Sequence, residues 1–169
     1  VAEMCYTLSK YAGLSEVMAQ KIRLASSMHD LGKIGIPDEI LNKNGKFLPE
    51  EYAVMKNHSR LGYEMLSHSK CELLRLAAEI AFSHHERIDG KGYPLGLSGN
   101  EIPLAGRICA VADVFDALIN VRCYKRPWSR EQVIALYQEE RGRQFEARLV
   151  DILLEHLDEF YEINDSMPD

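Results

Sequence analysis

Four predicted helices of this chain carry histidine or aspartate on the face that otherwise holds apolar residues. His29, His58 and His84 each continue the apolar stripe of one helix, and Asp113 lies on the small-residue face of a fourth. Any one such histidine is most simply explained as a structural residue, hydrogen-bonded inside a core. Together they constrain the fold strongly, because buried polar and charged groups in one small bundle are costly unless cations compensate them.

The spacing of the apolar residues predicts the fold class. They recur with helical periodicity along most of the chain, and no alternating strand pattern of useful length interrupts them. Gly13 stops the first helix, Ser15 can cap the second, and Ser129 with Gln132 forms a capping box. We therefore predict an all-α fold, a single compact helical bundle. The expected helices cover about residues 1–12, 15–29, 37–41, 49–66, 71–85, 103–119, a stretch starting at 129, and 149–160.

Length and composition exclude several classes of protein. At 169 residues the chain can form one domain with a buried core, and its net charge of −6 disfavours binding to duplex nucleic acid. No apolar run is long enough to span a membrane, so we expect no membrane contact from this domain. The four cysteines are scattered without C-x-x-C spacing, which is typical of reduced thiols in a cytoplasmic protein.

The polar residues on the helix faces and their neighbours form a set of possible metal ligands. The set comprises four histidines and two aspartates: His29, Asp30, His58, His84, His85 and Asp113. Imidazole and carboxylate ligands without cysteine suit iron, manganese or catalytic zinc better than a structural zinc site. Six ligands are too many for one metal with an open position, so we predict two metals that share a bridging carboxylate and activate water.

A glycine-rich loop, DGKGYPLG at residues 89–96, follows closely after the histidine pair His84 and His85. Glycine allows close approach of the backbone, and Tyr93 with Pro94 supplies a rigid apolar edge. A surface turn with an incidental Tyr-Pro pair is the simpler explanation of these residues when they are considered alone.

Four sequence blocks together resemble the HD-GYP family of HD metal-dependent phosphohydrolases. The blocks are HDLGKIGIPDEIL at 29–41, MKNHSRLGYEML at 55–66, HHERIDGKGYP at 84–94 and AVADVFDAL at 110–118. The resemblance covers about Val1 to Leu154. It implies that residues 1–169 are a catalytic HD-GYP domain of the HD-type helical bundle. It also implies that the start of the first helix and any upstream regulatory domain precede Val1.

The resemblance assigns roles to individual residues. It implies that the six ligands named above bind the metals, that Asp30 bridges them, and that Asp30 and Asp113 position the attacking water. Lys33 becomes a catalytic-site cation beside the reacting phosphate. The loop residues Tyr93 and Pro94, and the cations Arg122 and Lys125 after the Asp113 helix, become candidates for substrate binding.

The implied activity is hydrolysis of cyclic di-GMP to the linear dinucleotide pGpG, with GMP after a second cut, in bacterial signalling. Its cofactors would be two or three divalent ions, iron or manganese. The Gly92-Tyr93-Pro94 loop is also a candidate contact for diguanylate cyclase domains. Three alternatives stay open: a weakly active or inactive module that serves as a receptor or docking domain, a phosphohydrolase of another nucleotide such as hybrid cyclic GMP-AMP, and a purely structural bundle.

Overall fold

Helices make up nearly all the regular structure of the chain. The computed structural model describes residues 1–121 and 126–167, and two isolated β-bridges are the only strand-like pairings within these ranges. The elements are α1 (Ala2–Tyr11), α2 (Glu16–Ser26), the 3-10 helix η1 (Leu31–Gly35), α3 (Asp38–Leu41), α4 (Pro49–Lys56), α5 (His58–Ser67), α6 (Glu72–Ser83), the 3-10 helix η2 (Gly99–Glu101), α7 (Leu104–Ile119), α8 (Arg130–Glu140), α9 (Ala147–Glu155) and α10 (Leu157–Asp165). The prediction of an all-α fold is confirmed.

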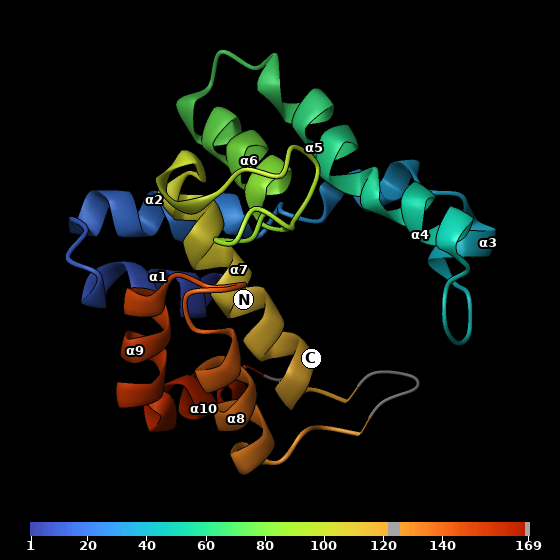
Figure 1. Ribbon diagram of the computed structural model, residues 1–169. Helices are drawn as coiled ribbons and strands as arrows, with labels where there is room; N and C mark the ends of the chain where they lie inside the picture. The colour runs from blue at the N-terminus through green and yellow to red at the C-terminus, as the bar shows by residue number, and fades with distance from the viewer. Residues whose placement is uncertain (122–125, 168–169) are drawn as a thin grey trace.

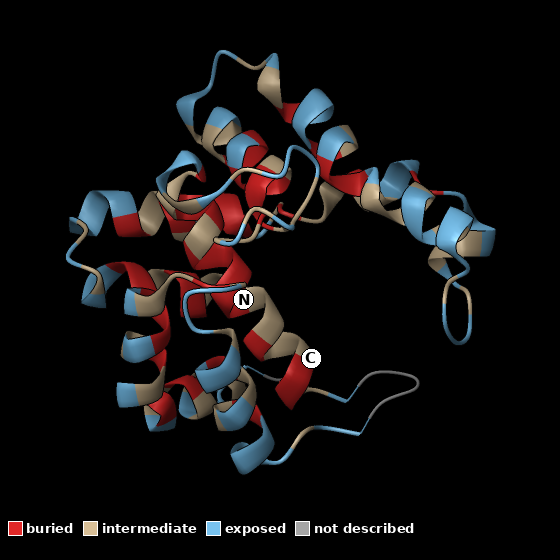
Figure 2. Cartoon of the chain, in the orientation of Figure 1, coloured by how far each residue is buried: buried red, intermediate tan, exposed pale blue. Residues whose placement is uncertain are grey.

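Helix α7 is the central element of the bundle. It packs against α1, α6, α8 and α9, and the buried residues along it form the dark red middle of Figure 2. Ile108, Val111 and Phe115 are fully buried on its apolar face. Gly106 lets α7 approach α6 closely, because a Cβ at this position would overlap the Ser83 side chain. This approach brings the first turn of α7 next to the end of α6.

Two further close approaches join η1 to α5 and α5 to α6. A Cβ at Gly32 would overlap the backbone of His58 and Gly62, and a Cβ at Gly62 would lie 3.1 Å from the Ala81 Cβ. Helices α5 and α6 run side by side in Figure 1, and η1 packs on α5. The residues just before and within η1 are therefore held against the first turn of α5.

Two predicted helices are each divided in the structure. The expected helix 49–66 breaks at Asn57, where the chain tightens: the Asn57 N–H donates to Val54 O at 3.0 Å, and His58 Nδ1 lies 2.7 Å from Met55 O. The expected helix 149–160 breaks at His156, whose backbone leaves helical geometry (φ −110°, ψ 26°). The His156 ring stacks on Tyr11 with centroids 3.7 Å apart, so it is not a free surface residue.

The segment formed by α3 and α4 stands out from the rest of the molecule (Figure 1). Helix α4 has no fully buried residue, and its Tyr52 is 47% exposed. Met18 on α2 and Met65 on α5 are also exposed, by 37% and 48%. None of the helices in the described ranges is long and apolar enough to cross a lipid bilayer.

Candidate metal centre

Five elements contribute the six predicted ligands to one cluster in the middle of the molecule. His29 follows α2, Asp30 precedes η1, His58 begins α5, His84 and His85 follow α6, and Asp113 lies in α7. Their donor atoms form two overlapping groups whose members lie within 4.8 Å of one another. The groups are Asp30 with His58, His84 and His85, and His29 with His84 and Asp113. The structure thus brings together every ligand that the sequence predicted.

Asp30 is the carboxylate that reaches toward several of the histidines. Its Oδ1 lies 3.4 Å from His58 Nε2 and 3.7 Å from His84 Nε2, while its Oδ2 lies 3.4 Å from His29 Nε2. Asp113 Oδ1 lies 3.3 Å from His29 Nε2. The two oxygens of Asp30 thus face different histidines of the cluster, and its role as a bridging ligand stays a prediction.

Backbone carbonyls orient three of the imidazoles. His29 Nδ1 lies 2.6 Å from Ser26 O, His58 Nδ1 lies 2.7 Å from Met55 O, and His84 Nδ1 lies 3.0 Å from Ala81 O. A carbonyl oxygen can only accept, so each Nδ1 carries the proton and donates it. The lone pair of each neutral ring is consequently on Nε2 and points into the cluster, as in protein sites where imidazole binds a metal.

The inward-facing atoms fit a cation and lack other partners. His29 Nε2, His84 Nε2 and Asp30 Oδ1 are buried and make no hydrogen bond with any described residue. His85 Nε2 lies 3.1 Å from His58 Nε2, which is an acceptor because His58 donates from Nδ1, so without a cation only the Nε2–H tautomer of His85 satisfies it. Leaving buried acceptors unsatisfied costs about 1–3 kcal/mol each. Divalent metals would satisfy all of them, and the chain therefore has a His/Asp cluster able to bind metal ions.

The protonation of the cluster also favours metal binding. Burial, helped by the nearby His84 and His58, lowers the pKa of His85 to about 2. Burial likewise lowers the pKa of His58. Burial acts against ionisation of Asp113, but the neighbouring His29 outweighs it and lowers the pKa of this carboxyl to about 2. At neutral pH His58 and His85 are thus neutral and Asp113 is ionised, which are the forms that bind metals.

Without a metal, a proton takes the place of the cation at His29. Burial opposes charge on this imidazole, but Asp113 and Asp30 outweigh it and raise its pKa to about 9. The pKa of Asp30 is held well below its usual range in spite of burial, by His84, His29 and Lys33. The pKa shifts of His29 and Asp30 both indicate that the part of the cluster around these two residues favours positive charge.

The cluster opens into a cleft of about 550 Å³. The cleft is lined by Tyr52, His84, His85, Glu86, Arg87, Lys91, Gly92, Tyr93, Ala110, Asp113, Val114 and Gln144. Lys33 lies beside the cluster, with its Nζ 2.7 Å from Asp30 Oδ2 and its side chain 39% exposed. The lysine therefore holds Asp30 in place and keeps further N–H donors for another group.

The glycine-rich loop packs directly on the histidine pair. A Cβ at Gly92 would overlap the backbone of His85 and Arg87, so only glycine fits there. The Tyr93 N–H donates to His85 O at 3.2 Å, and the two rings stack with centroids 4.8 Å apart. Pro94, joined to Tyr93 by a cis peptide bond, is exposed and lies outside the residues that line the cleft.

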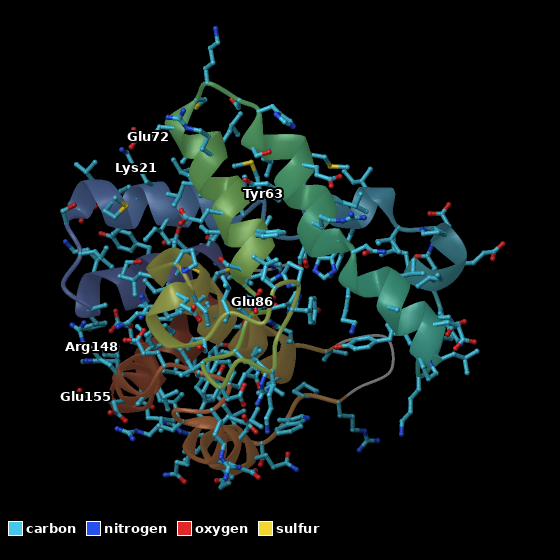
Figure 3. All side chains as sticks on the ribbon, turned by 45° about the horizontal axis from the view of Figure 1, so that its top comes forward. Lys21, Tyr63, Glu72, Glu86, Arg148 and Glu155 are labelled. Atoms are coloured by element: carbon cyan, nitrogen blue, oxygen red, sulfur yellow. The ribbon has the colours of Figure 1, made fainter. Side chains whose placement is uncertain are left out.

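Sequence reasoning missed Glu86, the residue that holds this loop in shape. Glu86 is 3% exposed and accepts hydrogen bonds from Leu95 N–H at 2.7 Å and Leu97 N–H at 3.0 Å. Figure 3 shows its side chain beside the loop, near the centre of the molecule. The available signal was an acidic residue directly after the histidine pair and before a glycine-rich loop, where free N–H groups need an acceptor.

Two predicted substrate contacts cannot be placed. Arg122 and Lys125 lie outside the described residues. Tyr93 lines the cleft, and its role in substrate binding stays a prediction.

The HD domain family matches residues 1–149 of the chain. Over the whole chain, 50% of residues are identical to the 3′3′-cGAMP-specific phosphodiesterase 2 of Vibrio cholerae, of which the match covers 32%. The cyclic di-GMP phosphodiesterase response regulator RpfG of Xanthomonas campestris is 50% identical over 147 residues, which is 87% of this chain and 39% of the relative. This chain thus spans between a third and two fifths of the length of these relatives.

A solved structure supports the fold. The crystal structure of a cyclic GMP-AMP-specific phosphodiesterase of V. cholerae, V-cGAP3, superimposes with a TM-score of 0.64 over 95% of this chain and 44% of that chain. Its sequence identity is 17%, so the likeness concerns the fold alone. Together with the ligand cluster and the intact Gly92-Tyr93-Pro94 triplet, these matches show that the chain belongs to the HD domain family, in its HD-GYP branch.

Proposed function

We propose that this domain is a metal-dependent phosphodiesterase that hydrolyses cyclic di-GMP to pGpG and, by a second cut, to GMP. The observation that carries the proposal is the complete His/Asp cluster, whose buried acceptors lack partners and which opens into the cleft. The printed activities of the relatives, cyclic di-GMP and cyclic GMP-AMP phosphodiesterases, support the same reaction class.

Two divalent ions would be held by the two ligand groups, with Asp30 contributing one oxygen to each side. Iron or manganese suits these nitrogen and oxygen donors. A third ion would need ligands other than those named here. When bound, the ions supply Lewis-acid stabilisation of the phosphoryl oxygens and lower the pKa of water.

The residues of the chain would position the substrate and the attacking water. Asp30 and Asp113 accept hydrogen bonds from water at the floor of the cleft and orient it toward phosphorus. Lys33 donates from the open side of the cluster to an oxygen of the phosphate, where negative charge develops. Tyr93 and the loop fix His85 from one side and exclude bulk water from that part of the cleft.

Cyclic GMP-AMP is a second candidate substrate. The relative that is 50% identical over the full length of this chain carries that specificity in its name. The two substrates differ only in one base, so the metal centre cannot distinguish them, and base contacts elsewhere in the cleft must. The receptor alternative is weaker, because neither the ligand set nor the Gly92-Tyr93-Pro94 triplet is broken.

A substrate panel tests the proposal. The protein is loaded with Mn²⁺ or Fe²⁺ under reducing conditions, its metal content is measured, and cyclic di-GMP and cyclic GMP-AMP are offered separately. We expect conversion of cyclic di-GMP to pGpG, detected by chromatography, and loss of turnover in His58→Ala. A protein that holds two metals and opens neither ring would disprove the proposed activity.

The exposed end of the loop offers a contact for diguanylate cyclase domains. Pro94 is exposed, and the adjacent Leu95 is 62% exposed, so both apolar side chains are accessible next to the cleft. Binding of a purified diguanylate cyclase domain should weaken in Leu95→Ser. Equal affinity for both proteins, measured by interferometry, would argue against this contact.

A further inference from the structure

A second hollow lies next to the metal-centre cleft and shares Tyr93 with it. This hollow of about 260 Å³ is lined by Ala53, Lys56, Asn57, Arg60, Tyr93 and Pro94. Lys56 ends α4, and Arg60 lies four residues later in the first turn of α5. Asn57 between them keeps near-helical geometry (φ −64°, ψ −16°), so the two cations face the same side, as helical residues at this spacing do.

Lys56 is held over aromatic rings instead of being paired with an acid. Its Nζ lies 5.0 Å from the Tyr52 ring centroid and 5.6 Å from that of Tyr93. No carboxylate among the described residues forms an ion pair with it, although Lys43 on the neighbouring segment pairs with Glu51. Lys56 is thus a half-buried lysine of an acidic chain (net charge −6), and its charge is available to an anionic ligand.

Arg60 is only weakly neutralised. Its one ion-pair partner in the described structure is Glu64, at 3.8 Å, and both side chains are more than half exposed (60% and 55%). Such exposed pairs contribute little binding energy, so an anionic ligand can compete for the guanidinium. The Asn57 side chain adds an amide that can donate a further hydrogen bond.

Of the described residues, only Tyr93 lines both this hollow and the metal-centre cleft, so the two are adjacent. The Tyr93 ring stacks on His85 with centroids 4.8 Å apart, and the same ring lies under the Lys56 ammonium. Tyr52 lines the metal-centre cleft and meets Tyr93 edge to face at 6.4 Å. The two hollows thus adjoin at Tyr93, and a ligand held at the metals can extend toward Lys56 along the protein surface.

We propose that Lys56 and Arg60 form an anion subsite for the phosphate that is not being cut, beside Tyr93, whose ring contacts both His85 and Lys56. This inference rests on the proposed cyclic dinucleotide substrate. It adds a second contact that a phosphodiester with a single phosphate cannot make. The subsite thus selects dinucleotides over small phosphodiesters.

A merely structural role for Lys56 makes a different prediction. If the lysine only pins α4 to the loop through Tyr52 and Tyr93, its loss should loosen Tyr93 and His85. Every substrate would then be affected alike, whether it carries one phosphate or two. Comparison of two substrates separates these explanations.

The experiment measures steady-state kinetics with cyclic di-GMP and with bis(p-nitrophenyl) phosphate, using Mn²⁺-loaded protein. Lys56→Gln and Arg60→Gln should each raise KM for cyclic di-GMP five- to tenfold with little change in kcat, because the contact exists in the ground state and transition state alike. KM for the small diester should stay within twofold. The KM of the unaltered protein for cyclic di-GMP should also rise more steeply with salt than that of Lys56→Gln.

Lys70→Gln is the charge-matched control, since Lys70 is exposed in the turn between α5 and α6 and lines neither hollow. Unchanged KM for cyclic di-GMP in both subsite variants, or equal losses on both substrates, would overturn the subsite. Failure of the unaltered protein on both substrates would instead count against the proposed function. In that case, binding of cyclic di-GMP measured by calorimetry still tests the subsite, because Lys56→Gln should weaken it at least fivefold and equal affinities would refute it.

Discussion

Replacing Glu86 with glutamine should destabilise the protein and disorder the loop beside the metal centre. The carboxylate is buried and accepts from two backbone N–H groups, at 2.7 Å from Leu95 N and 3.0 Å from Leu97 N. Glutamine can satisfy one of them with its carbonyl oxygen, but its amide NH₂ then faces the other donor. A lost charge-assisted hydrogen bond costs about 1.5–3 kcal/mol, and the stranded N–H adds to it. We expect a total loss of about 2–4 kcal/mol in the free energy of unfolding.

Urea denaturation checks the magnitude of this loss. With a slope of roughly 2 kcal/mol per M, the midpoint should fall by about 1–2 M while the slope itself stays constant. Activity should fall as well, because the loop no longer holds Tyr93 against His85. We expect kcat/KM for cyclic di-GMP to fall at least tenfold, with metal content unchanged, since Glu86 is not among the metal-binding groups.

Glu155→Gln is the matched control for this change. Glu155 is exposed at the end of α9, so the same substitution there should leave the midpoint nearly unchanged. If Glu86→Gln unfolds at the same urea concentration as the unaltered protein and keeps its kcat/KM, then Glu86 does not anchor the loop, and the loop's shape must come from its glycines alone.

Three further predictions concern the ligands and the metals. Asp30→Ala should abolish activity and lower the metal content measured by elemental analysis, because this carboxylate faces both halves of the cluster; retention of two metals would exclude a bridging role. Lys33→Ala should retain the metals and lower kcat, since a charged lysine has no lone pair for a metal, and an unchanged kcat would remove it from the mechanism. Removal of the metals by a chelator should lower the melting temperature by several degrees in calorimetry, because the cluster's unsatisfied acceptors then lose their cations, and no shift would show that the cluster is satisfied without them.

The sequence indicated the ligand cluster because its residues stand on helices or near their ends. His58 and His84 share faces with apolar residues, and that pattern alone indicates burial. The resemblance to the HD-GYP family indicated that these residues from separate helices belong to one metal site. The helix breaks at Asn57 and His156 escaped prediction, because each depends on a contact of a neighbouring ring or carbonyl that periodicity does not encode.

The second hollow and the loop anchor could not be predicted from local pattern. Lys56 and Arg60 read as ordinary solvent-facing residues of an amphipathic helix, and only the position of Tyr93 in space gives them a common neighbour. Glu86 reads as one more acidic residue in a polar loop. The second hollow and the Glu86 anchor both depend on contacts between segments more than eight residues apart. A single sequence does not show which residues of such segments are in contact.

Gly32 shows how a single small residue can control the whole metal centre. It lies in η1 between Asp30 and Lys33, and a Cβ there would overlap the backbone carbonyl of His58. Backbone cannot rotate away as a side chain can, so Gly32→Ala must push η1 off the first turn of α5. That movement would separate Asp30 Oδ1 from His58 Nε2, which are now 3.4 Å apart.

Gly35→Ala is the matched control in the same 3-10 helix. Its Cβ would meet the Leu61 Cδ1 at 2.9 Å, and the end of a leucine side chain can move aside. Gly32→Ala should therefore lose about 1–3 kcal/mol or more of stability, the range for overpacking, and most of its metal affinity. Gly35→Ala should lose less stability and keep its metals. Equal metal content in the two variants, by elemental analysis after dialysis, would show that the approach of η1 to α5 does not set the distance between Asp30 and His58.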